Sequence, residues 1–376
     1  MFVYTDSRPS IFYYNRGFHK KKLCCAMKEK FIDLDTASSL ELQKIVEALS
    51  VPGKGLLASD ESPTSLNDKF EEFGIENTEN FRRDYRQMLF SANKYELMKY
   101  ISGVILHNET LYQKTTDGIS FAEFLQQRNI VPGIKVDKGL INLSGTKNES
   151  TTEGLDNLKE RCMQYKREGC HFTKWRCVYS ISETKPSQLL MSVNASTLAR
   201  YATICQSARL VPIVEPEILS VGEHSIEKAL QIHEEVLSIV FRALNEHRVY
   251  LEGMILKLAM VLPGVKDTNY TSQIVADYTL KALQRTVPPA VPTILFLSGG
   301  QTDEDSILNL NAINTSEGKK PWTLSFCYGR CLQNEVMKIW KGKVANVEAA
   351  QSVFLKKAKL CSEASLGKVN VQDQCQ

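Results

Sequence analysis

Five side chains in the middle of the chain have the types and the spacing that acid–base and covalent chemistry require. Lys174 and Arg176 are two residues apart, Glu215 and Glu217 are two residues apart, and Lys257 ends an apolar run. Alternate residues of a strand face the same side, so each pair can point into one cavity. An ordinary salt-bridged strand end explains either pair alone, but both pairs on successive strands would interact with each other.

Lys257 directly follows the apolar run 253–256, where an unpaired ammonium is costly. We expect burial and neighbouring cations to lower its pKa and leave a neutral, nucleophilic amine. Such an amine can attack a carbonyl to form a Schiff base, with Glu215 shuttling protons as the carbinolamine loses water. The alternative is a lysine that snorkels out of the strand end.

Two later segments suit a phosphate. Residues 297–301 read Leu-Ser-Gly-Gly-Gln and 328–330 read Tyr-Gly-Arg, each offering backbone N–H groups where a strand gives way to a helix. The first segment is also the signature of ABC ATPases, but the chain has no GxxxxGK[ST] phosphate loop, so we exclude that class. A plain strand-to-helix turn remains the alternative.

Eight short apolar runs separated by amphipathic stretches predict the elements that position these groups. The runs are Leu56 to Ser59, Gly103 to Leu106, Gly133 to Val136, Phe172 to Val178, Val211 to Val214, Gly253 to Leu256, Ile294 to Leu297 and Leu324 to Cys327. Alternating buried strands and helices favour parallel pairing, and eight repeats predict an α/β fold, a single-domain (β/α)8 TIM barrel. Because reactive groups gather at the C-terminal ends of barrel strands, Asp60, Lys135, Ser298 and Arg330 are expected to share one mouth with the five residues above.

Composition excludes several classes of protein. The formal net charge of +3 and a pI near 8.2 are too mild to indicate a nucleic-acid or membrane partner. Ten cysteines without CxxC pairs indicate reduced thiols in the cytosol, and six scattered histidines have no zinc-ligand spacing. We therefore expect no metal.

The chain divides into three parts. Residues 1–33 are predicted to be a disordered N-terminal extension, 34–368 the barrel, and 369–376 a short C-terminal tail. Within the barrel, Ser225 is expected to cap a long helix, Ser120 and Glu123 form a capping box, and Gly169 ends a helix striped by Cys162 and Tyr165.

The motifs taken together closely resemble class I fructose-bisphosphate aldolase. They are Asp60-Glu61-Ser62, residues 109–114 (ETLYQK), 133–139 (GIKVDKG), 174–176 (KWR), 211–217 (VPIVEPE), 250–253 (YLEG), 285–290 (RTVPPA), 297–301, 309–314 and 328–330, so the likeness spans roughly Leu34 to Lys368.

The resemblance implies a role for each matching residue. The lysine matching Lys257 forms the Schiff base, the glutamate matching Glu215 is its acid and base, and Asp60, Lys174 and Glu217 match supporting catalytic groups. Substrate hydroxyls and the two phosphates would be bound by Ser62, Ser65, Lys69, Lys135, Arg176, Ser298, Gly299, Gly329 and Arg330. The implied activity is reversible cleavage of fructose 1,6-bisphosphate in glycolysis, without metal or cofactor, by a cytoplasmic homotetramer.

The chain departs from the family pattern at several positions. Asp68 stands for a lysine, Lys69 for an arginine, Phe81 for an asparagine, His107-Asn108 for Phe-His, Leu258-Ala259 for Pro-Asn and Cys327 for a serine, and the chain ends at Gln376 without the family's C-terminal tyrosine, which is implicated in proton exchange on the enamine. The first two changes remove a cation and a guanidinium that could bind the 6-phosphate through two hydrogen bonds. We therefore predict a divergent paralogue with slowed catalysis, and a larger loss of activity for a bisphosphate than for a monophosphate substrate. The rival hypothesis is a catalytically impaired paralogue that binds a partner such as a cytoskeletal protein.

Overall fold

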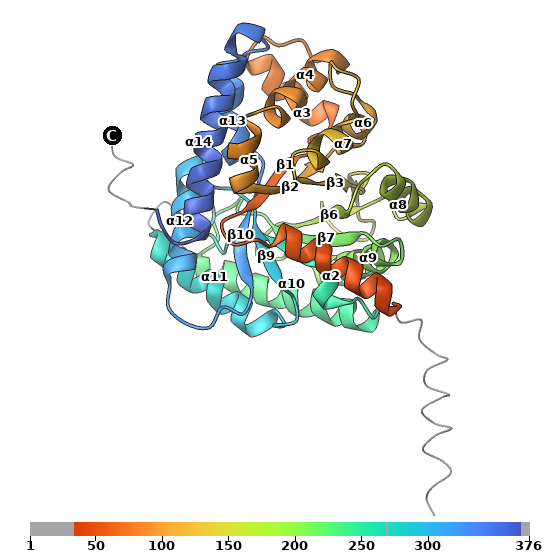
Figure 1. Ribbon diagram of the computed structural model, residues 1–376. Coiled ribbons are helices and arrows are strands. Elements are labelled where there is room, and N and C mark those ends of the chain that lie inside the picture. Colours follow the sequence, from red (N-terminus) through yellow and green to blue (C-terminus); the bar gives the residue numbers. More distant parts are fainter. Residues whose placement is uncertain (1–33, 268–269, 370–376) are drawn as a thin grey trace, which may run out of the picture. The chain divides into compact units, whose positions relative to one another are not determined.

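Eight parallel strands close into a barrel in the computed structural model, which describes residues 34–267 and 270–369 (Figure 1). The expected N-terminal extension, 1–33, and nearly all of the expected tail lie outside the described residues. Around the barrel the strands follow the order β1, β10, β9, β8, β7, β6, β3, β2. Their bounds are β1 Gly55–Ser59, β2 Ile101–Leu106, β3 Val131–Lys135, β6 Phe172–Tyr179, β7 Val211–Ile218, β8 Ile255–Leu258, β9 Thr293–Phe296 and β10 Thr323–Tyr328.

The predicted (β/α)8 fold is therefore confirmed, and two of the strand bounds that differ from the prediction concern residues of the site. Strand β7 continues past Val214 through Glu215 and Glu217, so these carboxylates belong to the strand itself. Strand β8 begins only at Ile255, because Leu251–Gly253 forms the 3-10 turn η1. A further hairpin, β4 Leu140–Asn142 paired with β5 Ser150–Thr152, was not predicted.

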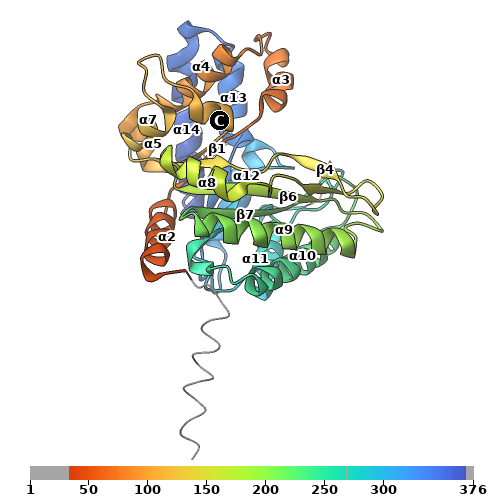
Figure 2. The same cartoon turned by 90° about the vertical axis from the view of Figure 1, so that its right-hand side faces the viewer.

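Helices surround the barrel, as two views at right angles show (Figures 1 and 2). They are α2 Thr36–Leu49, α3 Pro63–Glu72, α4 Glu79–Phe90, α5 Lys94–Tyr100, α6 Asn108–Tyr112, α7 Phe121–Gln126, α8 Leu158–Arg167, α9 Gln188–Ser207, α10 Ile226–Glu246, α11 Ser272–Thr286, α12 Asp303–Thr315, α13 Arg330–Trp340 and α14 Val347–Ser365, with a second 3-10 turn, η2 Val344–Asn346. The expected caps form: Ser120 accepts from the N–H of Glu123, and Ser225 from that of Lys228.

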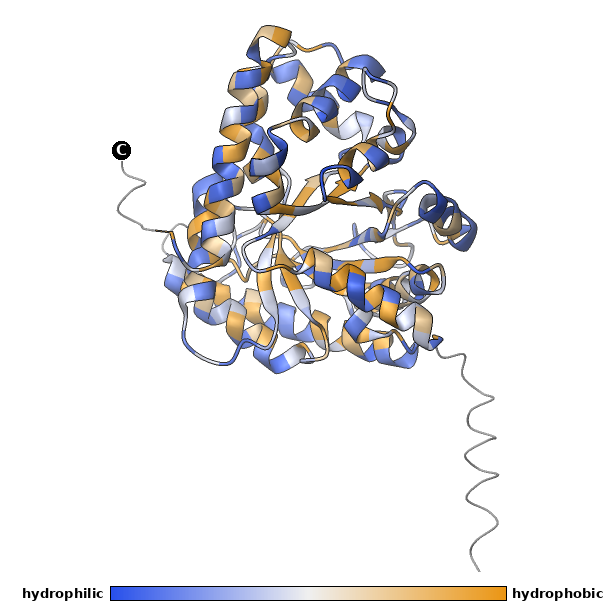
Figure 3. Cartoon of the chain, in the orientation of Figure 1, coloured by the Kyte–Doolittle hydropathy of each residue, from blue (hydrophilic) through white to orange (hydrophobic). Residues whose placement is uncertain are grey.

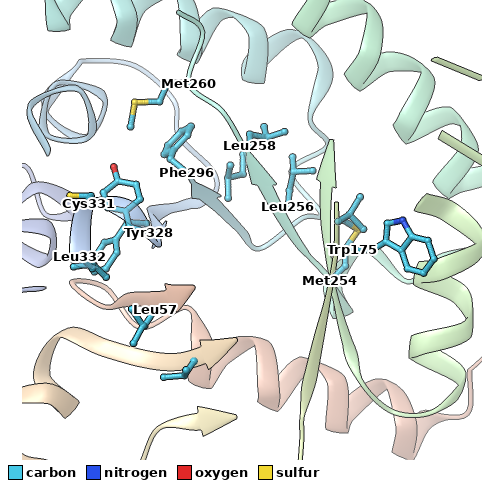
Figure 4. Packing of buried hydrophobic residues seen from close by; sticks show 14 of the residues in the cluster. Leu57, Trp175, Met254, Leu256, Leu258, Met260, Phe296, Tyr328, Cys331 and Leu332 are labelled. Atoms are coloured by element: carbon cyan, nitrogen blue, oxygen red, sulfur yellow. The ribbon is translucent and has the colours of Figure 1, made fainter. Parts of the chain in front are cut away.

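The core lies between the strands and the helices, and the helices turn their polar faces outward (Figure 3). On this outer side of the barrel Trp175 of β6 packs against Tyr201 of α9, with ring centroids 5.3 Å apart. Trp175, Leu256 and Phe296 come from three different strands and lie among the buried residues drawn in Figure 4. Successive residues of a strand point to opposite sides of the sheet. The immediate neighbours of Trp175, Leu256 and Phe296 in their strands therefore face the barrel interior.

Phe172 fills the interior of the barrel below the functional side chains. It shares one face of β6 with Lys174 and Arg176. A Cβ added at Gly133 of the neighbouring strand β3 would stand 2.3 Å from the Phe172 ring, so only glycine leaves room for it. The interior is thus packed beneath the mouth.

Helix α2 closes the opposite, N-terminal end of the barrel. Ser102 at the start of β2 donates to the Leu49 carbonyl at 2.9 Å, and Ser50 accepts a hydrogen bond from Thr293 at the start of β9. The C-terminal strand ends remain the place where a ligand can enter.

Candidate active site at the C-terminal mouth of the barrel

The C-terminal ends of the strands surround one cavity of about 1030 Å³. All fourteen residues that the sequence proposed for the site line it: Asp60, Ser62, Ser65, Lys69, Lys135, Lys174, Arg176, Glu215, Glu217, Lys257, Ser298, Gly299, Gly329 and Arg330. Apart from Ser65 and Lys69, which lie within α3, they belong to or closely follow seven of the eight barrel strands; the exception, β2, is followed by His107 and Asn108, which also line the cavity.

A buried chain of charges forms the centre of the cavity. Lys257 Nζ lies 2.8 Å from Glu215 Oε1, and Lys174 Nζ lies 3.6 Å from Glu215 Oε2 and 2.5 Å from Asp60 Oδ2. Lys257 is only 4% exposed and Glu215 only 2%. Strand register produces the first contact, since Ile213 pairs with Ile255 and the two functional residues follow two positions further on.

Two further ion pairs lie among the residues that line the cavity. Arg176 Nε bonds Glu217 Oε2, and Lys135 Nζ lies 2.5 Å from Asp137 Oδ1. Asp137 also accepts from the Arg176 backbone N–H at 3.4 Å, so the loop after β3 and strand β6 hold each other in place.

The expectation that the pKa of Lys257 is lowered is wrong. Burial and Lys174 act in that direction, but Cys327, Glu215 and Asp60 act against them, and the pKa lies above its ordinary value. Burial raises the pKa of the Cys327 thiol to about 11, so at neutral pH the charge that holds the proton on Lys257 is the Glu215 carboxylate, 2.8 Å from Nζ. Lys257 therefore rests as an ammonium, and its nucleophilic form requires a proton acceptor.

The neighbouring carboxylates are ionised. Burial opposes the charge of Asp60, but Lys174 and Lys257 bring its pKa down to about 2. Lys174 and Lys257 likewise hold the pKa of Glu215 below its ordinary value despite burial. Asp60 and Glu215 in turn raise the pKa of Lys174 against the effect of burial. Two ammonium groups thus face two carboxylates, and a proton can pass from Lys257 to Glu215 over 2.8 Å.

Helix N-termini and tight turns flank this centre. Ser62 caps α3, where its Oγ accepts from the Ser65 N–H at 3.1 Å, and Gly329 occupies the cap position of α13 ahead of Arg330. A Cβ at Gly299 would stand 2.7 Å from an Arg330 Nη atom, so the turn after β9 approaches that guanidinium closely.

The cavity carries an excess of positive charge. Its lining includes eight basic side chains and five carboxylates: Lys69, Lys135, Lys138, Arg161, Lys174, Arg176, Lys257 and Arg330 against Asp60, Glu61, Asp137, Glu215 and Glu217. This balance suits an anionic ligand with more than one phosphate.

Further lining residues were not proposed as site residues. They include Glu61, His107, Asn108, Asp137, Arg161 and Tyr165. Glu61, His107, Asn108 and Asp137 lie one or two residues past the ends of β1, β2 and β3. The rule that functional residues follow the C-terminal ends of barrel strands would have been sufficient to find them. Arg161 and Tyr165 come from α8, where no sequence signal points to a site; Arg161 donates to the Val136 carbonyl at 2.9 Å and so supports the loop after β3.

The departures from the family pattern fall in different places. Asp68 is exposed on α3 and does not line the cavity, whereas Lys69 does and lies 3.4 Å from Glu61 Oε1. Leu258 and Ala259 are buried. Cys327 lines the cavity and is fully buried beside Lys257.

The described residues contain neither a metal-ligand cluster nor a membrane-spanning helix. In 34–267 and 270–369 we find no cluster of three His, Cys, Asp or Glu side chains suited to a metal ion. Over the same ranges no helix combines the length and the apolar character needed to cross a bilayer.

A closed parallel barrel with a buried lysine, paired carboxylates and cationic helix N-termini at its C-terminal mouth defines a barrel enzyme for an anionic small molecule. The sequence profile described as fructose-bisphosphate aldolase class-I matches residues 41–376. The chain belongs to this family, whose members are carbon–carbon lyases.

Individual relatives agree with the family. The chain is 54% identical to fructose-bisphosphate aldolase of Echinococcus multilocularis, over 87% of this chain and 90% of that protein. It is 53% identical to that of Schistosoma mansoni, over 89% and 92%. A solved structure of fructose-bisphosphate aldolase from Plasmodium falciparum, in complex with TRAP and a small-molecule inhibitor, superimposes with a TM-score of 0.88 at 46% identity, covering 90% of this chain and 98% of that one.

Proposed function

We propose that the chain cleaves fructose 1,6-bisphosphate reversibly to dihydroxyacetone phosphate and glyceraldehyde 3-phosphate through a Schiff base on Lys257. The observation that carries the proposal is the 2.8 Å contact between Lys257 Nζ and Glu215 Oε1 inside a cationic cavity. A buried amine needs an adjacent base, and here that base is in place.

Imine formation begins with proton transfer. Glu215 takes a proton from the Lys257 ammonium, and the neutral amine attacks the C2 carbonyl carbon to give a carbinolamine. Glu215 then returns a proton to the C2 hydroxyl, which leaves as water, and a protonated imine remains. Lys174 stays cationic and holds the Asp60 carboxylate, so Glu215 is the group free to change its protonation state.

Carbon–carbon cleavage follows from the charge on the imine. Loss of the C4 hydroxyl proton to Glu215 forms the aldehyde carbonyl, and the electron pair of the C3–C4 bond moves to the imine to form a neutral enamine. The developing charge is spread over nitrogen, which lowers the barrier relative to a bare carbanion. Protonation of the enamine and hydrolysis of the imine then release dihydroxyacetone phosphate.

The phosphates are assigned to the two flanks of the cavity. Ser298 and Gly299 follow β9, the neighbour of β8 with Lys257, and Gly329 and Arg330 follow β10, the next strand around the barrel; these four residues would bind the 1-phosphate. Ser62 and Ser65 at the N-terminus of α3, with Lys69 from the last turn of the same helix, would bind the 6-phosphate. Lys135, Arg176 and Glu217 would orient the hydroxyls between them.

We also propose that catalysis is slower than is usual for the family, mainly for the bisphosphate. Lys69 offers one ammonium rather than a bidentate guanidinium, and that ammonium is shared with Glu61 at 3.4 Å. The 6-phosphate must therefore compete with an existing partner, whereas a substrate that carries only the 1-phosphate does not depend on this flank.

Borohydride trapping tests the proposal. Purified chain is incubated with dihydroxyacetone phosphate and reduced, and peptide mapping locates the adduct; the matched control is Lys257→Met. Capture at Lys257, with aldehyde release from fructose 1,6-bisphosphate, is the expected result. If a folded chain forms no covalent adduct with dihydroxyacetone phosphate, the proposed enzymatic activity is refuted. That result would favour a paralogue that only binds a protein partner.

A cytoplasmic homotetramer is part of the same proposal. The matched relatives from Arabidopsis thaliana and Spinacia oleracea are named as cytosolic and cytoplasmic forms. Light scattering of the purified chain checks the tetramer, and co-sedimentation with cytoskeletal filaments checks that class of partner.

A further inference from the structure

His107 places an imidazole in the cavity that the reaction outlined above does not use. It directly follows β2, and it lines the cavity together with Asn108. Its Nδ1 accepts a hydrogen bond from the Glu109 backbone N–H at 3.2 Å. A ring nitrogen that accepts carries no proton, so the neutral ring has its N–H at Nε2.

The Nε2–H group is available to a ligand. Within the part of the chain that the structure describes, no hydrogen-bond partner is recorded for His107 Nε2, and this atom is not among the buried unpaired ones. One nitrogen is thus anchored to backbone while the other is a fixed donor on a cavity wall.

Strand order places this donor opposite the Schiff-base side. The ketone carbon must reach Lys257 on β8, and the nearest phosphate site follows β9 and β10. The remainder of the sugar chain therefore extends toward β1, β2 and β3, where Asp60, His107 and Lys135 stand. This remainder is the half that leaves as the aldehyde.

Burial favours the neutral form of the ring. Burial, followed by the Arg86 cation of α4, holds the pKa of His107 below its ordinary value; Lys135 acts in the same direction, and Asp60 and Glu109 act in the opposite one. A neutral donor suits a hydroxyl or carbonyl oxygen, whereas the phosphates are matched by the cations of the cavity.

We propose that His107 is a specificity-determining residue whose Nε2–H donates a hydrogen bond to an oxygen of the aldehyde half of the sugar phosphate. The inference rests on the proposed function and assigns this position to recognition of the leaving fragment, not to imine formation.

Two substitutions test the role of the Nε2–H donor separately from that of Nδ1, which accepts from the Glu109 N–H. In His107→Asn, Oδ1 can still accept from the Glu109 N–H, but no group reaches the position of Nε2. In His107→Gln, the amide nitrogen reaches that position and restores a donor. The assays are steady-state cleavage of fructose 1,6-bisphosphate and exchange of the C3 hydrogen of dihydroxyacetone phosphate in D2O, which needs only the ketone half.

His107→Asn is expected to lower kcat/KM for cleavage about three- to tenfold, as for one lost neutral hydrogen bond, and to leave the exchange rate within about twofold. His107→Gln is expected to recover most of the loss. Cleavage by His107→Asn within twofold of the unaltered chain, or an equal loss in exchange, would overturn the inference. If the unaltered chain shows neither exchange nor borohydride capture, the proposed function itself fails; if it shows both, only the assignment of His107 is at stake.

Discussion

Replacing Glu215 by glutamine should make Lys257 more reactive toward a simple reagent while making catalysis much slower. The carboxylate lies 2.8 Å from Lys257 Nζ. At an effective dielectric constant of about 20, a pair of unit charges at that separation interacts by roughly 6 kcal/mol, which sets an upper limit of about four units on the fall in the pKa of Lys257. Burial and Lys174 already act to lower that pKa and remain in the variant. The neutral fraction of the amine at a given pH should therefore be larger in the variant.

The assay compares labelling with turnover. Trinitrobenzenesulfonate labelling of Lys257, followed by peptide mapping between pH 6 and 10, should be at least about tenfold faster at pH 7.5 in Glu215→Gln, as expected for a pKa lower by one unit or more. Turnover should fall by about 10² to 10⁴, the usual contribution of a general acid–base group. Glu217→Gln is the matched control for labelling, since Glu217 pairs with Arg176 and the Lys257–Glu215 contact stays intact. Unchanged or slower labelling in Glu215→Gln would show that Glu215 does not hold the proton on Lys257.

Three other perturbations test separate parts of the structure. Asp60→Asn leaves Lys174 without its 2.5 Å partner and should destabilise the fold by about 2 to 4 kcal/mol at pH 7. Because the folded-state pKa of Asp60 lies near 2, the stabilisation that Asp60 provides is complete above about pH 4 and is lost as pH falls toward 2. The stabilities of the unaltered chain and the variant, measured in urea melts, should therefore converge as pH falls through that window. Gly133→Ala drives a methyl group into the Phe172 ring and should cost about 1 to 3 kcal/mol in urea melts, with Phe172→Leu in the same chain relieving part of the cost; an unaltered midpoint would mean that the barrel interior relaxes freely. Lys69→Arg should lower KM for fructose 1,6-bisphosphate several-fold and leave that for fructose 1-phosphate unchanged, and an equal effect on both substrates would contradict the assignment of this flank to the 6-phosphate.

Local pattern was sufficient for the architecture. Each apolar run of four to seven residues buries both faces of a strand, as in a parallel sheet covered by helices, and eight such strands close into a barrel. Single side chains beside helix starts, such as Ser120 and Ser225, act on backbone groups three residues away, so their roles were readable from sequence. The hairpin β4–β5 was not readable, because its three-residue strands are too short to show a period.

Strand alternation and strand ends likewise determined which side chains would meet. Lys174, Arg176, Glu215, Glu217 and Lys257 face one interior because residues two apart on a strand share a side and parallel strands end together. Only the tertiary structure decided the charge state of Lys257 and which residues from outside the strands also line the cavity. The pKa of Lys257 depends on the balance between burial and the distances to Glu215 and Asp60, and these distances arise from register between strands more than forty residues apart. Arg161 lines the site from helix α8, and the position of that helix also depends on the tertiary structure. Both the pKa of Lys257 and the placement of α8 result from many contacts between residues far apart in the sequence, which no local sequence pattern encodes.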